Sequence, residues 1–265
     1  MARAVGFDVV LVDHDGLATD GGAGPAVARV PQVPAGTVAV YRGWMLSGDR
    51  YAALTGALAE RGVVLVTSVE QYRRAHELPG WYAALAEVTP RSVWTTGAGR
   101  DNFARACQQL GGGPAVLRDY TKSMKHYWHQ AAFIPDLADR AAAWAVASCF
   151  RQLRGDDFTG GFVLRRFEPF TSAEVRTWWV NGVCRLVGPH PDTPHEHPPA
   201  NLDLSAITPL IAALALPFVT VDLALRTDGV WRVIELGDGQ VSDRPTSITP
   251  ETLIATVADI RSNTR

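Results

Sequence analysis

The chain has 265 residues, 47% of them hydrophobic and 20% charged, with a formal net charge of −2. This balance fits one large or two small globular domains, and the charge gives no general attraction to nucleic acid or to an anionic membrane. Apolar stretches such as Ile207 to Val221 are interrupted by prolines and threonines and fall short of the roughly 18 apolar residues of a membrane span, so we expect neither nucleic acid nor membrane as a partner.

The first ninety or so residues alternate between predicted strands and helices. "FDVVLVDHD" predicts a strand from Phe7 to Val12, and "GTVAVYRGWML" predicts a second around Val38 to Tyr41. "DRYAALTGALAERG" predicts a helix that ends at Gly62, and "VVLVTS" follows as a strand of the kind buried in parallel sheets. "VEQYRRAHELPGWYAAL" predicts a helix broken at Pro79–Gly80. This alternation favours a small α/β domain with a parallel sheet.

The rest of the chain is predicted to be antiparallel α+β. "TTGAGRDNFARACQQLGGG" predicts a turn, a helix and a glycine stop, and "PAVLRDY" predicts a strand at Ala115 to Arg118. A further strand is expected at Gly161 to Phe167. Hairpins are expected to turn at Asn181–Gly182 and at Asp228–Gly229. The last helix should begin after Thr249 as its N-cap.

The cysteines and the N-terminus bear on the compartment. Cys107, Cys149 and Cys184 are widely spaced and form no CxxC motif, as is typical of reduced thiols in core positions. The N-terminus has no basic stretch followed by an apolar core and a cleavage site. We therefore expect a cytoplasmic protein.

Two acids lie inside the strands of the second hairpin. Asp222 and Glu235 are surrounded by Val, Leu and Ile, and two acids on paired strands repel each other unless a cation lies between them. Asp238 follows three residues after Glu235, and such oxygen ligands are what Mg²⁺ takes together with substrate phosphates. The pattern predicts a magnesium site of Asp222, Glu235 and Asp238. In the alternative, Asp222 and Glu235 face solvent and pair with Arg226 or Arg232.

Basic residues gather after the first strand of the second part. Lys122 and Lys125 are the only lysines of the chain, and with Arg118 they can direct several donors at one anion. Arg176 and Arg185, on the first hairpin, add two cations. Metal-binding acids with such cations are typical of a nucleoside triphosphate site, and the absence of GxxxxGK[ST] excludes a P-loop. In the alternative, the two lysines lie in a solvated loop.

Taken together, these segments resemble the ATP-grasp proteins, and most closely a small bacterial and phage clade of ATP-grasp domains. The resemblance covers nearly the whole chain and implies an N-terminal α/β (pre-ATP-grasp) domain at residues 1–92, followed at residues 93–265 by a two-lobed ATP-grasp fold with antiparallel sheets. In chain order, the matching segments are "VYRGWML", "VEQYRRAHELPGWY", "VLRDYTKSMKHYW", "FIPD", "GGFVLRRFEPF", "EVRTWWVNG" and "VDLALRTDGVWRVIELGDGQVSDRP".

The resemblance implies that ATP lies between the two lobes. Arg118 would meet the α- and β-phosphates, and Arg176 would contact a phosphate or an acyl phosphate. Lys122 and Lys125 would close over the triphosphate, a task that suits mobile ammonium groups. Arg176, Lys122 and Lys125 are therefore the candidate catalytic residues.

The resemblance also assigns the base, the ribose and the metal. The hinge formed by Arg166, Phe167 and Glu168 would receive adenine, with Glu168 near the ribose. The Mg²⁺ ligands would be Asp222, Glu235 and Asp238. Two positions depart from the family pattern, since many ATP-grasp enzymes have Lys in place of Arg118 and Asn in place of Gly237.

For the substrate, the resemblance points to the first domain. Arg42 lies at the end of a predicted strand, where parallel sheets bind ligands, and is expected to pair with a substrate carboxylate. The alternative for Arg42 is a structural ion pair. Arg185 is a second candidate for the substrate.

The histidines suggest no further site. His126 and His129 are expected on an exposed helical face. A proline-rich, solvated loop is expected to contain His190, His195 and His197.

The activity implied is that of an ATP- and Mg²⁺-dependent carboxylate–amine ligase. It would form an amide or peptide bond through an acyl phosphate and release ADP and phosphate, acting on a small-molecule or peptide carboxylate and amine. One alternative is an ATP-dependent phosphotransferase on the same fold. Another is a catalytically silent module that binds nucleotide or protein, which Arg118 and Gly237 favour. The sequence leaves the substrates and the oligomeric state open.

Overall fold

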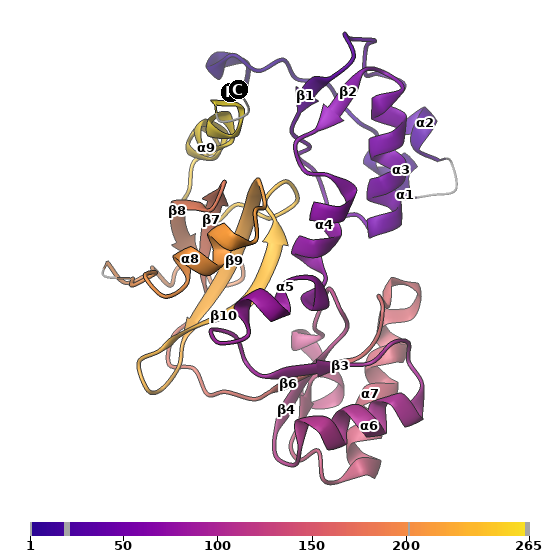
Figure 1. Ribbon diagram of the computed structural model, residues 1–265, viewed down its shortest axis with the longest axis vertical. Helices are drawn as coiled ribbons and strands as arrows, with labels where there is room; N and C mark the ends of the chain where they lie inside the picture. Colours follow the sequence, from indigo (N-terminus) through magenta and orange to yellow (C-terminus); the bar gives the residue numbers. More distant parts are fainter. Residues whose placement is uncertain (1, 19–21, 201, 263–265) are drawn as a thin grey trace.

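The computed structural model describes residues 2–18, 22–200 and 202–262, and three parts follow one another along its longest axis (Figure 1). In the upper part, β1 (Thr37–Ala39) and β2 (Val63–Leu65) form a parallel pair joined by α3 (Gly48–Ala59). Ser47 caps α3, and Gly62 with a φ of 85° ends the turn after it. The predicted strand–helix–strand unit is confirmed. The other helices here are η1 (Ala2–Val5), α1 (His14–Ala18), α2 (Ala23–Ala26) and α4 (Val69–His76).

The strand predicted at Phe7 to Val12 is wrong. Residues 7–13 have no regular secondary structure, and Val9, Val10 and Leu11 keep 44%, 48% and 64% of their surface exposed. An apolar run becomes a buried strand only where a sheet edge bonds its backbone and a second layer covers its side chains. In the described residues, the upper sheet consists of β1 and β2 alone, so this segment lies outside it.

The lower part is an antiparallel sheet in the order β3 (Ser92–Trp94), β6 (Val163–Arg166), β4 (Ala115–Arg118) and β5 (Phe133–Ile134). Helices α6 (Arg100–Leu110) and α7 (Arg140–Arg154) pack on it around an aromatic core. Strand β4 matches the predicted strand residue for residue, which places Arg118 at its end. The remaining turns are η2 (Lys125–Tyr127), the π-helical η3 (Trp128–Ala132) and η4 (Gly155–Asp157).

The middle part is a second antiparallel sheet, in the order β10 (Trp231–Asp238), β9 (Phe218–Leu225), β7 (Val175–Val180) and β8 (Val183–Pro189). Asn181 and Gly182 turn the β7–β8 hairpin with φ angles of 49° and 77°, and Gly229 turns the β9–β10 hairpin with a φ of 85°. Both predicted hairpins are confirmed.

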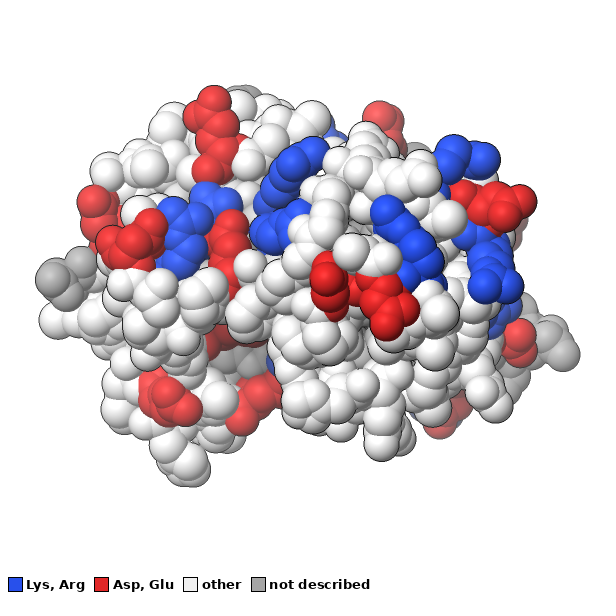
Figure 2. All heavy atoms as spheres, turned by 90° about the horizontal axis from the view of Figure 1, so that it is seen from below, with Lys and Arg blue, Asp and Glu red and all other residues white. Residues whose placement is uncertain are grey.

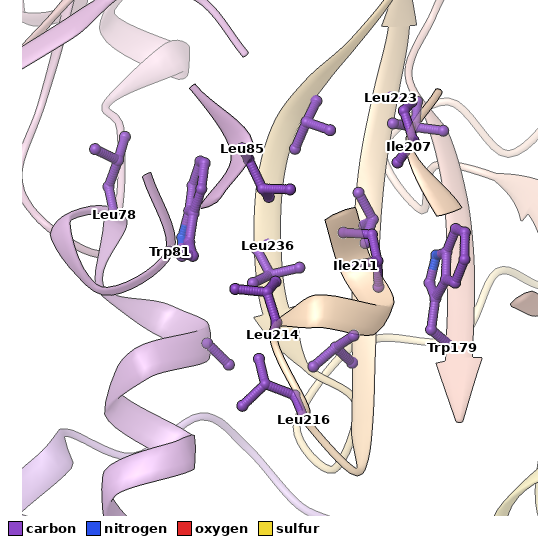
Figure 3. Packing of buried hydrophobic residues seen from close by; sticks show 14 of the residues in the cluster. Leu78, Trp81, Leu85, Trp179, Ile207, Ile211, Leu214, Leu216, Leu223 and Leu236 are labelled. Carbon is purple, nitrogen blue, oxygen red and sulfur yellow. The ribbon is translucent and has the colours of Figure 1, made fainter. Parts of the chain in front are cut away.

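Helices α5 (Leu78–Leu85) and α8 (Thr208–Ala213) cover one face of the middle sheet. The predicted break in the helix before them falls at Glu77, because Pro79 suits the first turn of a new helix. The expected division into residues 1–92 and 93–265 remains a prediction. The side chains that face β9 and β10 from these helices are Leu78, Trp81, Leu85, Ile211 and Leu214 (Figure 3).

The opposite face of the middle sheet has two uses. At one end, Trp178 and Phe218 pack against α9 (Pro250–Ser262), whose N-cap is Thr249 as predicted. Farther along, Arg176 and Asp222 point from the same face, since side chains alternate along a strand. This polar end borders the lower sheet.

No described helix is long and apolar enough to cross a membrane. Figure 2 shows the molecule from below, with lysine and arginine side chains lying among aspartate and glutamate. Binding to nucleic acid relies on a concentrated basic area, and this face offers none.

Candidate functional site

A cavity of about 570 Å³ lies where the middle sheet meets the lower sheet, with the upper part at one edge. That volume is within the range of small-molecule sites. Arg42, Arg185 and Asp238 do not line it. Nine predicted site residues do: Arg118, Lys122, Lys125, Arg166, Phe167, Glu168, Arg176, Asp222 and Glu235.

Asp222 of β9 and Glu235 of β10 are partners across the antiparallel pair. Arg176, on the other neighbour of β9, holds Asp222 with two hydrogen bonds of 2.8 Å, from Nε to Oδ1 and from Nη2 to Oδ2. Burial alone would raise the pKa of Asp222, but hydrogen bonding and charge from Arg176 outweigh it and leave the pKa well below its ordinary value. Asp222 is therefore a fixed anion in the cavity.

Glu235 is held more loosely than Asp222. Its oxygens lie 3.8 Å from Nη1 of Arg118 and 3.7 Å from Nζ of Lys122. Burial opposes ionisation, but Lys122 and Arg118 bring the pKa of Glu235 below its ordinary value. Its carboxylate thus remains an anion whose oxygens are not closely bonded to these two cations.

Asp119, which sequence reasoning missed, shapes the loop that carries the lysines. Its Oδ1 accepts hydrogen bonds from the amides of Thr121 and Lys122 at 2.8 and 2.7 Å, and its Oδ2 accepts one from Nε of Arg154 at 2.8 Å. Asp119 is fully buried, so these partners satisfy a charge that would otherwise be costly. The acid fixes the backbone from which Lys122 reaches Glu235. An aspartate that bonds amides two and three residues later is an Asx-turn, a signal available in the sequence.

One end of the cavity is aromatic. The ring centroids of Phe133 and Phe167 lie 5.3 Å apart, and Trp128 stacks on Phe133 at 5.4 Å. Phe167 and Trp128 line the cavity together with Val116 and Ile234. Such an end suits a flat ring. Phe167 was predicted for this role, whereas Trp128, three residues after Lys125, was missed.

The polar residues of the hinge are engaged with the protein. Glu168 accepts a hydrogen bond of 2.9 Å from Arg232 and lies 3.5 Å from Arg226. Arg166 donates to main-chain carbonyls of residues 110–114. Because Arg226 and Arg232 bind Glu168, the alternative that they pair with the two cavity acids is wrong.

The structure separates Asp238 from the other predicted metal ligands. Strand β10 continues to Asp238, so Glu235 and Gly237 share one face and Asp238 points to the other. There it is fully buried, its Oδ1 accepts the amide of Gln240 at 2.7 Å, and its Oδ2 has no partner among the described residues. Burial raises the pKa of Asp238 to about 6.

The two predicted substrate residues also lie elsewhere. Arg42 is directed at the loop after β10, where its guanidinium donates to the carbonyls of Gly239, Gln240 and Ser242. This arrangement favours a structural role for Arg42. Arg185 is exposed on β8, outside the lining of the cavity.

Of the histidines assigned to exposed segments, His126, His129, His195 and His197 are exposed as predicted. The assignment is wrong for His190, which is 8% exposed and has its Nε2 3.0 Å from Nη2 of Arg176. The cause is the length of β8, because the pairing of Arg176 with Gly188 brings the end of that strand to the cavity.

Two sets of side chains can hold a divalent cation. Asp222 and Glu235 offer carboxylate oxygens from neighbouring strands, which suit Mg²⁺. Glu174, His190 and Asp222 form a mixed set, with one ligand atom of each within 4.8 Å of the others. Burial and the charge of Asp222 raise the pKa of Glu174. Sequence reasoning missed Glu174, although its position two residues before Arg176 was a signal for the same face.

Comparison with known proteins connects this geometry to a family. Residues 109–257 match a family of ATP-grasp domains, described as family 3 of its clade. No curated protein matches the sequence significantly.

Several solved structures share the fold. A RimK domain ATP-grasp protein from Sphaerobacter thermophilus is 18% identical, with a TM-score of 0.59 over 84% of this chain and 80% of that one. D-cycloserine synthetase DcsG is 16% identical, with a TM-score of 0.60 over 85% and 83%. The ATP-grasp ligase PsnB, in a complex with a precursor variant, Mg and ADP, is 14% identical, with a TM-score of 0.54 over 100% and 91%. The predicted α/β plus α+β fold with antiparallel sheets is thereby confirmed.

Proposed function

The chain belongs to this clade family of ATP-grasp domains, and from this membership we propose that it is an ATP- and Mg²⁺-dependent ligase that joins a carboxylate to an amine. The reaction passes through an acyl phosphate and releases ADP and phosphate. Two proteins of the same fold support the ligase class, since one is a synthetase and the other is a ligase in complex with Mg and ADP.

The observation that carries the proposal is the distribution of charge in the cavity. Arg118, Lys122 and Arg176 line it together with Asp222 and Glu235, and the aromatic end lies in the same cavity. Cations suit a triphosphate, paired acids suit a divalent metal, and the aromatic end suits a nucleobase. A nucleoside triphosphate with its metal satisfies all three.

The donor set fits magnesium. Asp222 and Glu235 would hold the ion, because they are ionised neighbours whose oxygens face the cavity. When bound, Mg²⁺ neutralises phosphate charge and orients the triphosphate. Arg118, Lys122 and Arg176 neutralise the remaining charge, and the loop set by Asp119 positions Lys122.

The chemistry asks the protein mainly for positioning. A carboxylate oxygen attacks the γ-phosphorus, the bond to the bridging oxygen breaks, and ADP leaves with that electron pair. The amine nitrogen then attacks the carbonyl carbon, phosphate leaves and the amine releases a proton. Because both steps transfer groups between bound reactants, holding them in line supplies most of the acceleration.

Calorimetric titration with ATP, with and without Mg²⁺, tests the proposal. We expect binding that requires Mg²⁺ and weakens about tenfold or more in Glu235→Ala, since that variant lacks a metal ligand. Gly56→Ala, a change on α3 with no atom within 4 Å of the added carbon, is the matched control. Absence of binding under every condition would contradict the proposal.

Product analysis separates the ligase from its rivals. A panel of carboxylates and amines should give ADP release that requires both. A stable phosphorylated product formed without an amine would identify a phosphotransferase. Binding of ATP without turnover for any pair would identify a silent module.

A further inference from the structure

A small polar recess opens from the cavity beside Glu235. It is bordered by Gly237, His76, Thr220 and Ser242, all of which line the cavity. A Cβ built on Gly237 would lie 3.2 Å from Oγ1 of Thr220, 3.4 Å from Oγ of Ser242 and 3.9 Å from Cε1 of His76. The glycine thus leaves a space of about one methyl group where three polar side chains meet.

The backbone does not explain this glycine. Gly237 lies in β10, paired with Thr220, and does not have a positive φ. Glycine within a strand weakens it and often marks a place where a ligand approaches. The missing side chain therefore points to an occupant of the recess.

The hydroxyl groups of the recess present lone pairs. Oγ of Ser242 donates its single proton to the carbonyl of Asp238 at 2.9 Å, because a carbonyl can only accept. Thr220 Oγ1 lies 2.7 Å from Ser242 Oγ, so Thr220 must be the donor in that bond. Both hydroxyl protons are then used, and the oxygens that face the recess can only accept.

His76 supplies a third acceptor. It comes from α4 of the upper part, and its buried Nε2 has no hydrogen-bond partner among the described residues. Buried polar atoms are nearly always hydrogen-bonded to protein, water or ligand. Burial, then the charge of Lys122, lowers the pKa of His76 to about 3, so the imidazole is neutral and accepts a hydrogen bond without taking the proton.

We propose that this recess binds the amine nucleophile of the ligase reaction as a primary amine, with Thr220, Ser242 and His76 accepting its N–H groups. The inference rests on the proposed function. A nitrogen with its hydrogens has the size of the methyl group that the recess accommodates, and it brings donors where the protein has only acceptors. A carboxylate would bring further acceptors and be repelled. An N-methyl group would meet the side chains that a Cβ on Gly237 would meet.

The test uses three small probes on protein loaded with ADP and Mg²⁺. Saturation-transfer difference NMR measures binding of n-propylamine, N-methylpropylamine and butyrate. We expect n-propylamine to bind best, and its affinity to fall about fivefold or more in Gly237→Ala and in Thr220→Val, as the loss of one hydrogen bond predicts. Gly56→Ala, which adds the same methyl group far from the recess, should bind like the wild type.

Two results would overturn the inference. One is preferential binding of butyrate or N-methylpropylamine, and the other is unchanged n-propylamine affinity in both recess variants. Thermal unfolding identifies a variant that fails to fold, and Thr220→Val keeps the shape of the buried side chain if Gly237→Ala does not fold. Calorimetry with ADP and Mg²⁺ separates the two proposals, because retained nucleotide binding with no effect at the recess overturns only the amine subsite.

Discussion

The two faces of β10 bury acids in opposite ways. On the cavity face, Glu235 lies within 4 Å of Arg118 and Lys122, and its pKa falls below the ordinary value. Three residues later, on the side that meets the upper part, Asp238 is fully buried with one oxygen unpartnered, and its pKa rises to about 6. The difference teaches that a ligand site needs acids ionised beside cations, and that spacing along a strand decides which acids meet this condition.

The largest effect is expected at Asp222, the most tightly held acid of the cavity face. Asp222→Asn leaves the buried Arg176 guanidinium without its anion and should lower the free energy of unfolding by about 3–5 kcal/mol. Because the pKa of Asp222 lies below its ordinary value of 3.8, this contribution is full above that pH and is lost as the pH falls further. Urea denaturation at pH 7 and at pH 3 measures both effects. An equal loss at the two pH values would break the comparison.

The opposite slope is expected at Asp238. A raised pKa means that the folded protein keeps the proton, so stability falls as the pH rises from 3.8 to about 6 and stays lower above it, by about 3 kcal/mol in all. Asp238→Asn cannot titrate and should remove this slope. Denaturation of the variant and the wild type from pH 4 to pH 8 measures it. A slope that survives the substitution would assign it to another group.

Nucleotide binding sharpens the same contrast. Glu235→Gln should weaken binding of ATP with Mg²⁺ by about tenfold or more, while Asp238→Asn should change it by about twofold at most. Both substitutions replace one carboxylate by an amide on the same strand, so each controls for the other. Calorimetry at pH 8 compares them. Equal losses would return Asp238 to the metal site.

The smallest effect is expected at the lysine loop. Lys122→Arg keeps the charge but replaces a compact ammonium by a planar fork, and should weaken ATP binding about fivefold. Lys122 lies 46% exposed at its side chain beside Glu235, so the fold should be unaffected. Titration of the variant with ATP and Mg²⁺ measures the change. Normal binding and turnover would show that the loop requires only a charge.

Much of the fold could be predicted because local signals agree with it. Asn181–Gly182 is a turn sequence that requires positive φ, and the structure has that turn. Phe7 to Val12 misled because the apolar run has no sheet edge to join, which is a property of the whole fold.

The site was predictable where the sequence held a motif, and not where distant segments meet. The pairing of Asp222 with Glu235 follows from one hairpin turn. The position of His190 depends on how far β8 extends, and the recess at Gly237 depends on α4 from the upper part. Asp238 was grouped with the other acids because spacing was counted without the alternation of the strand.

The most direct test of the account is anomalous diffraction from crystals grown with Mn²⁺ and a non-hydrolysable ATP analogue. The account predicts a metal peak bound by Glu235 and Asp222, with the triphosphate beside Arg118, Lys122 and Arg176 and the base at the aromatic end. A peak at Asp238, or one held by Glu174 and His190 without Glu235, would contradict it.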